Sequence, residues 1–122
     1  MSREQERVVH MVAELLNVMF SMGARDIRSE IRESPDQFSV SVRGETRGDI
    51  HPKLKKIKKL LRMPRQVEME EELWSLAGSV DYDTELSLVG MMTDEADVRY
   101  DGEAGVVEIE LVRKKQSRSS SL

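Results

Sequence analysis

The segment FSVSV at residues 38–42 decides the fold, because its apolar side chains alternate with serines. Alternation with a period of two predicts a strand with one buried and one wet face. The preceding segment, residues 24–32, alternates in the same way, and Ser34-Pro35-Asp36 between the two segments is a typical turn. We therefore expect a β-hairpin, followed by a loop over residues 43–51, which are polar and contain two glycines.

Helical periodicity flanks this hairpin on both sides. Apolar residues recur at helical spacing over residues 3–22, and Gly23 is a natural stop signal. After the loop, Pro52 can begin a helix at its first position, and the apolar pattern continues to Arg62 before Pro64 ends it. The sequence thus predicts one helix before the hairpin and one after it.

The remaining pattern predicts two more helices and a second hairpin. Residues 66–76 indicate a short helix that packs through Leu73, Trp74 and Leu76, and residues 78–83 indicate a loop. A further helix is expected over residues 84–96, with core-facing residues around Leu88. Alternating apolar residues then lie on either side of a turn at Asp101-Gly102 and predict the second hairpin (Val98, Tyr100, Val107, Ile109 and Leu111).

This order predicts an α+β fold, a two-layer α/β sandwich whose four-stranded mixed sheet carries helices on one face. The chain has 122 residues, which fits one domain. We expect that domain to span residues 1–112 and the polar, serine-rich residues 113–122 to be a disordered tail.

Composition limits the class of function. The chain has no cysteine, which excludes disulfides and thiolate metal sites. Its net charge of −4 and 4% aromatic content argue against nucleic-acid binding. No apolar run is long enough to span a bilayer and no signal-peptide pattern begins the chain, so the sequence predicts no membrane span and a cytoplasmic location.

Three stretches resemble motifs of the GHKL family of ATP-binding folds, which includes histidine kinases, anti-sigma kinases, type II topoisomerases and the heat-shock chaperone ATPase. They are ELLNVMFSMGA at residues 14–24, FSVSVRGETRGDI at residues 38–50 and DTELSLVGM at residues 83–91. The resemblance implies a GHKL-like sandwich and, if nucleotide binding is retained, ATP with magnesium. The residues that it would assign to this cofactor are Glu14, Asn17, Gly44, Glu45, Gly48 and Gly90.

The same motifs depart from the family pattern. The fourth residue after Glu14 is Val18, which cannot ligate magnesium, and Asn17 comes one position early, about 100° away around the helix. The adenine-reading aspartate and the phosphate-binding glycines are replaced by charged residues (Arg43 or Glu45, and Asp83 and Glu85). The sequence therefore favours a non-catalytic regulatory or protein-interaction module with a degenerate ATP site, no catalytic residues and no cofactor. The alternative is a small ATP-binding protein of the histidine-kinase or anti-sigma-kinase type.

A basic segment, HPKLKKIKKLLRMPR at residues 51–65, holds seven Lys or Arg residues. It predicts a surface for a protein partner formed by Lys55, Lys56, Lys59 and Arg62. The segment has no aromatic residue, which disfavours nucleic acid, and a homodimer is left open. A solvated helical face is the other interpretation, because the acidic run over residues 68–72 could pair with the segment inside the chain.

His10, Glu14, Asn17 and Ser21 share one stripe of the first predicted helix. The stripe is either the remnant of a nucleotide or metal site or simply the wet side of an amphipathic helix. His10 and Glu14 could ligate a metal, but two ligands without a third make a poor site, so no metal site is predicted. The only other histidine, His51, is expected to be solvated in a loop.

Overall fold

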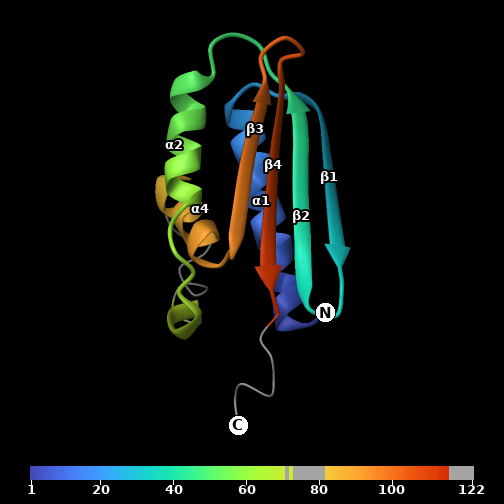
Figure 1. Ribbon diagram of the computed structural model, residues 1–122, viewed down its shortest axis with the longest axis vertical. Helices are drawn as coiled ribbons and strands as arrows, with labels where there is room; N and C mark the ends of the chain where they lie inside the picture. The colour runs from blue at the N-terminus through green and yellow to red at the C-terminus, as the bar shows by residue number, and fades with distance from the viewer. Residues whose placement is uncertain (71, 73–81, 116–122) are drawn as a thin grey trace.

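The computed structural model describes residues 1–70, 72 and 82–115, which form a four-stranded sheet with helices on one of its faces (Figure 1). Within these residues, no helix is both long and apolar enough to cross a bilayer. The elements are α1 (Arg3–Ser21), β1 (Arg25–Glu33), β2 (Gln37–Glu45), α2 (His51–Leu61), the 3-10 helix η1 (Val67–Met69), α4 (Tyr82–Met91), β3 (Glu95–Asp101) and β4 (Val106–Lys114).

The two predicted hairpins are confirmed, but the prediction of a mixed sheet is wrong. The strand order is β1-β2-β4-β3, and every described neighbouring pair is antiparallel. β2 and β3 run in the same direction without being neighbours, because β4 lies between them. Burial explains this strand order. β4 contributes three fully buried apolar side chains and lies at the centre of the sheet, whereas the charged β3 lies at an edge.

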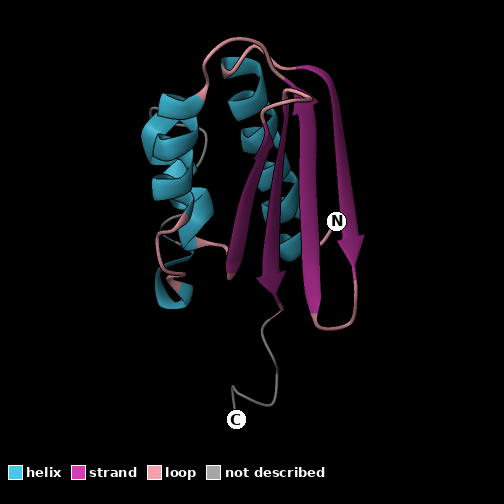
Figure 2. Ribbon diagram, turned by 45° about the horizontal axis from the view of Figure 1, so that its top comes forward, coloured by secondary structure: helices cyan, strands magenta, loops and turns pink. Residues whose placement is uncertain are grey.

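The core fills the space between the sheet and the helices (Figure 2). Val42 of β2 and its partner Ile109 of β4 are both fully buried, as are Met11 and Leu15 on the facing side of α1. Most residues on the opposite face of the sheet are polar or charged, as the alternation predicts, with Val106 and Val112 as exceptions. One register row there joins Ser41 of β2 to Glu110 of β4 and Asp97 of β3.

Helix α1 confirms the prediction for residues 3–22 to within a residue. It begins with a capping box, in which the Ser2 hydroxyl accepts from the Gln5 backbone N–H while the Gln5 side chain accepts from the Ser2 N–H. It ends before Gly23, whose φ of 71° allows the chain to turn back into β1 without strain.

Several predicted boundaries are wrong because long-range pairing extends the strands. β2 continues to Glu45, three residues into the predicted loop. Helix α4 includes Asp83 and stops at Met91, since the Asp94 N–H donates to the Val112 carbonyl and starts the β3–β4 ladder, which contains Glu95 and Ala96. The predicted packing residues Leu73, Trp74 and Leu76, and Gly78–Val80 of the predicted loop, lie outside the described residues.

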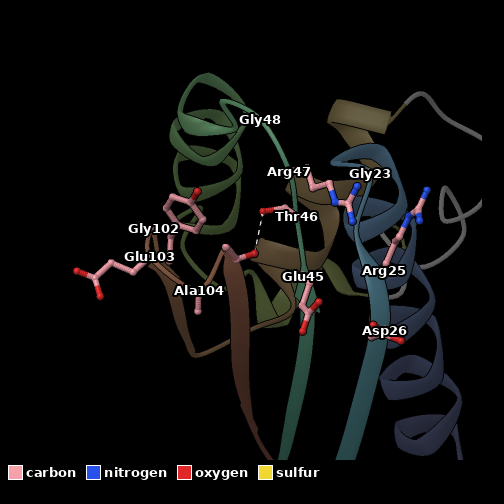
Figure 3. A pocket seen from close by; sticks show the side chains of 12 residues that line it. Gly23, Arg25, Asp26, Glu45, Thr46, Arg47, Gly48, Gly102, Glu103 and Ala104 are labelled. Atoms are coloured by element: carbon pink, nitrogen blue, oxygen red, sulfur yellow. Dashed lines mark hydrogen bonds between the residues drawn. The ribbon is translucent and has the colours of Figure 1, made fainter.

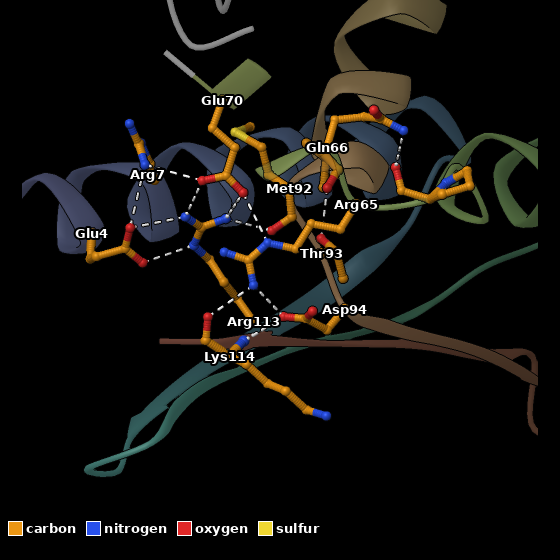
Figure 4. Close-up of polar contacts among 12 residues, drawn as sticks. Glu4, Arg7, Arg65, Gln66, Glu70, Met92, Thr93, Asp94, Arg113 and Lys114 are labelled. Atoms are coloured by element: carbon orange, nitrogen blue, oxygen red, sulfur yellow. Dashed lines mark hydrogen bonds and ion pairs between the residues drawn. The ribbon is translucent and has the colours of Figure 1, made fainter. Parts of the chain in front are cut away.

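The predicted tail also begins too early, because β4 extends to Lys114 and Arg113 is buried. Arg113 occupies the inner-face position that follows Val107, Ile109 and Leu111, and it is only 1% exposed. Its five N–H donors all find acceptors: two bonds go to Glu4, two to Glu70 and one to the Met92 carbonyl, at 2.7–3.1 Å (Figure 4).

Other ion pairs join the same buried cluster. Arg7 of α1 lies 3.2 Å from Glu70, and Arg65 lies 2.9 Å from Glu70 and 2.5 Å from Asp94. Burial alone would raise the pKa of the Glu4 carboxyl, but the hydrogen bonds and attraction of Arg113, with the charges of Arg7 and Arg65, lower it below its usual value. The cluster therefore holds charged groups from α1, β4 and the segment after α2 together.

We predict that Arg113→Met destabilises the protein by about 3–5 kcal/mol, because it leaves the Glu70 carboxylate buried without its main partner. Arg99→Met is the matched control, since Arg99 on the outer sheet face is 56% exposed and also pairs with carboxylates. It should cost less than about 1 kcal/mol. Urea unfolding followed by far-UV circular dichroism measures both, and equal losses would contradict the structural role of Arg113.

The lowered pKa of Glu4 predicts acid sensitivity with a defined sign. A carboxyl whose pKa is lower in the folded than in the unfolded chain stabilises the fold above its unfolded pKa, and that contribution disappears as pH falls through the folded pKa. Glu4→Gln should therefore lower stability at pH 7 and flatten its decline below about pH 4.5. Glu6→Gln is the control, because Glu6 lies in the same helical turn but is exposed. Parallel pH profiles for the two variants would refute the prediction.

Candidate functional site

The four predicted partner-binding residues lie together, three on α2 and Arg62 at its C-cap. Leu54, Ile57 and Leu61 turn the apolar side of this helix into the core. On the other side, the basic side chains line a shallow depression of about 570 Å³ beside Pro52 (Lys55, Lys56, Lys58, Lys59 and Arg62). We call this set the basic face of α2.

Three residues of the basic face have no partner within the part of the chain that the structure describes. Among the described residues, Lys55, Lys59 and Arg62 form no ion pair or hydrogen bond. Glu70, the buried acid of the run, turns inward to Arg65 and Arg113. Glu70 therefore pairs with the basic segment through its last residue, Arg65, and not through the lysines of α2.

The charge arrangement of α2 costs helix stability. The helix contains no acidic residue, and its lysines repeat at spacings of three and four residues, as in Lys55 and Lys59. Like charges at this spacing repel by about 0.2–0.5 kcal/mol per pair. Lysines also occupy its first turns, where the positive end of the helix dipole disfavours cations. An anionic partner would relieve both effects.

A second depression, of about 520 Å³, lies at the end of the sheet where β1 begins and β2 ends (Figure 3). Arg25 and Arg47 line it and form no ion pair within the described part of the chain. Thr46 donates a hydrogen bond to the Gly105 carbonyl at 3.1 Å and fixes the β3–β4 turn against the loop after β2. Three carboxylates also line the depression, so its electrostatics are mixed (Asp26, Glu45 and Glu103).

The predicted nucleotide contacts are distributed over different parts of the molecule. Glu45 and Gly48 line the sheet-end depression, and Gly44 lines a smaller one beside it. Gly90 lies between α4 and α2, where an added Cβ would lie 2.6 Å from the Leu60 carbonyl oxygen. Asn17 is exposed on α1. The structure therefore brings together only three of the six residues.

Glu14 lies in a different cluster, with His10 on α1 and Glu85 on α4. The His10 Nε2 and Glu85 Oε2 atoms are 3.2 Å apart. Helical spacing brings His10 and Glu14 together in the sequence, but it gives no sign of Glu85, which is 75 residues away from His10 in the chain. The other histidine, His51, is the first residue of α2 and not a loop residue; it is exposed and lies 3.3 Å from Asp49.

No family model matches this chain, and no curated protein matches it. The assignment of residues to roles therefore depends on the geometry alone.

We predict that Gly90→Ala destabilises the protein by about 1–3 kcal/mol, because its Cβ would clash with the backbone of α2. In an open helix the same change would be stabilising. Gly102→Ala is the control, since its Cβ would make only an ordinary 3.8 Å contact with Tyr100. Thermal unfolding checks both variants. Unchanged stability for Gly90→Ala would show that the glycine is not required for helix packing and would return it to the nucleotide hypothesis.

Proposed function

We propose that the protein is a non-catalytic interaction module whose basic face of α2 binds an acidic segment of a partner protein. The observation that carries the proposal is the concentration of cations along α2, of which Lys55, Lys59 and Arg62 have no neutralising partner among the described residues. Their energetic cost to the isolated helix supports a role in binding, since repulsion within α2 decreases when an anionic group approaches.

A protein partner fits this surface better than nucleic acid or a membrane. The depression is lined by lysine stems, whose methylene groups can contact apolar atoms of a peptide. None of its lining residues is aromatic, so bases would find no stacking platform. The chain as a whole carries a net charge of −4, which opposes approach to a polyanion over a wide surface.

The resemblance to the GHKL fold remains part of the proposal. The order of helix, hairpin, helices and hairpin supports it, whereas the antiparallel sheet departs from the mixed sheet that we expected. The alternative, a small ATP-binding protein, is supported by Arg25 and Arg47 beside Gly48, a combination able to hold an anion. Two observations weigh against this alternative: carboxylates line the same depression, and Glu14, Asn17 and Gly90 lie elsewhere in the molecule.

The test is charge reversal on the basic face. Proteins captured from lysate by the chain are identified, and the binding of each purified protein to the purified chain is then measured. Binding of a labelled oligo-glutamate peptide to the chain is measured in parallel. We expect Lys55→Glu/Lys59→Glu/Arg62→Glu to weaken binding of the purified partner and of the peptide by more than about tenfold, with a smaller difference at high salt.

The matched control is Arg28→Glu/Arg32→Glu/Arg43→Glu, which changes the charge equally on the outer face of the sheet. Circular dichroism verifies that both variants fold. Equal loss of binding in the two variants would show that binding depends only on the net charge of the protein, and it would refute the proposal. Tighter binding of a DNA duplex or of phosphatidylserine vesicles than of the acidic peptide would also contradict it.

A further inference from the structure

Three metal-binding side chains from two helices meet on the side of α1 that faces α4. His10 and Glu14 are one helical turn apart on α1, and Glu85 comes from the beginning of α4. One ligand atom of each residue lies within 4.8 Å of the other two. His10 and Glu14 are half-buried and Glu85 is 4% exposed, so the cluster is partly shielded but open to solvent on one side.

The spacing of the ligand atoms suits a small cation. A tetrahedral ion with bonds of about 2.1 Å places its ligand atoms about 3.4 Å apart. The 3.2 Å between His10 Nε2 and Glu85 Oε2 already matches that edge. The ligand atom of the half-buried Glu14 lies within 4.8 Å of both of these atoms and supplies the third corner of a three-ligand face.

Electrostatics favour an ion at the same place. Two carboxylates held close together in a partly buried site repel each other, and a divalent cation between them attracts both. A neutral imidazole contributes a lone pair to such an ion without adding charge. The arrangement of one His and two Glu therefore has the chemistry of a metal site and not merely of an acidic surface.

We propose that His10, Glu14 and Glu85 bind one divalent transition-metal ion, zinc foremost, that links α1 to α4. Imidazole nitrogen and carboxylate oxygen are ordinary zinc ligands, whereas magnesium and calcium prefer oxygen ligands alone. With three protein ligands, a tetrahedral zinc keeps one position for water. This site is separate from the basic face of α2 and does not depend on the function proposed for that face.

The experiment is a calorimetric titration of the metal-free full chain with zinc chloride, with magnesium chloride as a comparison. We expect one zinc per chain, no comparable magnesium binding, and a rise in the melting temperature with zinc concentration, because the ion binds only the folded arrangement. Glu14→Gln and His10→Asn should each weaken zinc binding by more than about tenfold, since loss even of a supporting residue commonly has that effect.

His51→Asn is the matched control, because it removes the other histidine, which also lies beside a carboxylate, Asp49. Its zinc affinity should equal that of the unmodified chain. Glu14 is half-buried, so Glu14→Gln tests the ligand set with little risk to folding, which circular dichroism checks. The proposal is overturned if the unmodified chain shows no saturable zinc binding, or if Glu14→Gln and His10→Asn bind zinc as tightly as His51→Asn does.

Discussion

The buried guanidinium of Arg113 constrains the arrangement of the helices on the sheet. It lies at the end of a central strand, where water cannot satisfy its donors, so the chain must bring acceptors to it. These come from the first turn of α1, from Glu70 after α2, and from the Met92 carbonyl after α4. Such a cluster need not add net stability over an apolar core, but it disfavours every packing that leaves one of its charges alone.

This internal pairing determines which charges remain for binding. Glu70 follows the basic segment closely in the sequence and would be a natural partner for its lysines. Because that carboxylate is engaged by three arginines inside the domain, it cannot also neutralise α2. Glu70 is thus held in the buried cluster, and Lys55, Lys59 and Arg62 have no ion-pair partner among the described residues. The proposed interaction surface is in this sense a consequence of how the core is charged.

Sequence periodicity predicted the elements that depend on local pattern. The alternation over residues 38–42 and over residues 107–111 identified both hairpins, and Gly23 identified the end of α1. The prediction failed at Arg113, a charged residue that occupies a buried position in the alternating pattern of β4. The strand order also escaped it, because alternation shows which face is buried but not which strand is the neighbour.

Candidate sites were harder to predict for the same reason. The basic segment is contiguous, so its four residues could be named from sequence, and they do lie together. The cluster of His10, Glu14 and Glu85 joins groups 75 residues apart, and only the helix pair α1–α4 brings them within reach. Gly90 shows the opposite case, in which a motif resemblance suggested a ligand contact and the structure shows close packing against α2.

Side-chain contacts join helix α1 to Glu70 and to Glu85. Arg7 pairs with Glu70, and His10 contacts Glu85. The first contact does not involve the proposed metal ligands, so it does not depend on metal concentration. The second would be strengthened by a divalent ion and weakened without one. Metal occupancy would therefore act on the attachment of α4 while leaving the Arg113 cluster, and with it the placement of α1 on the sheet, unchanged.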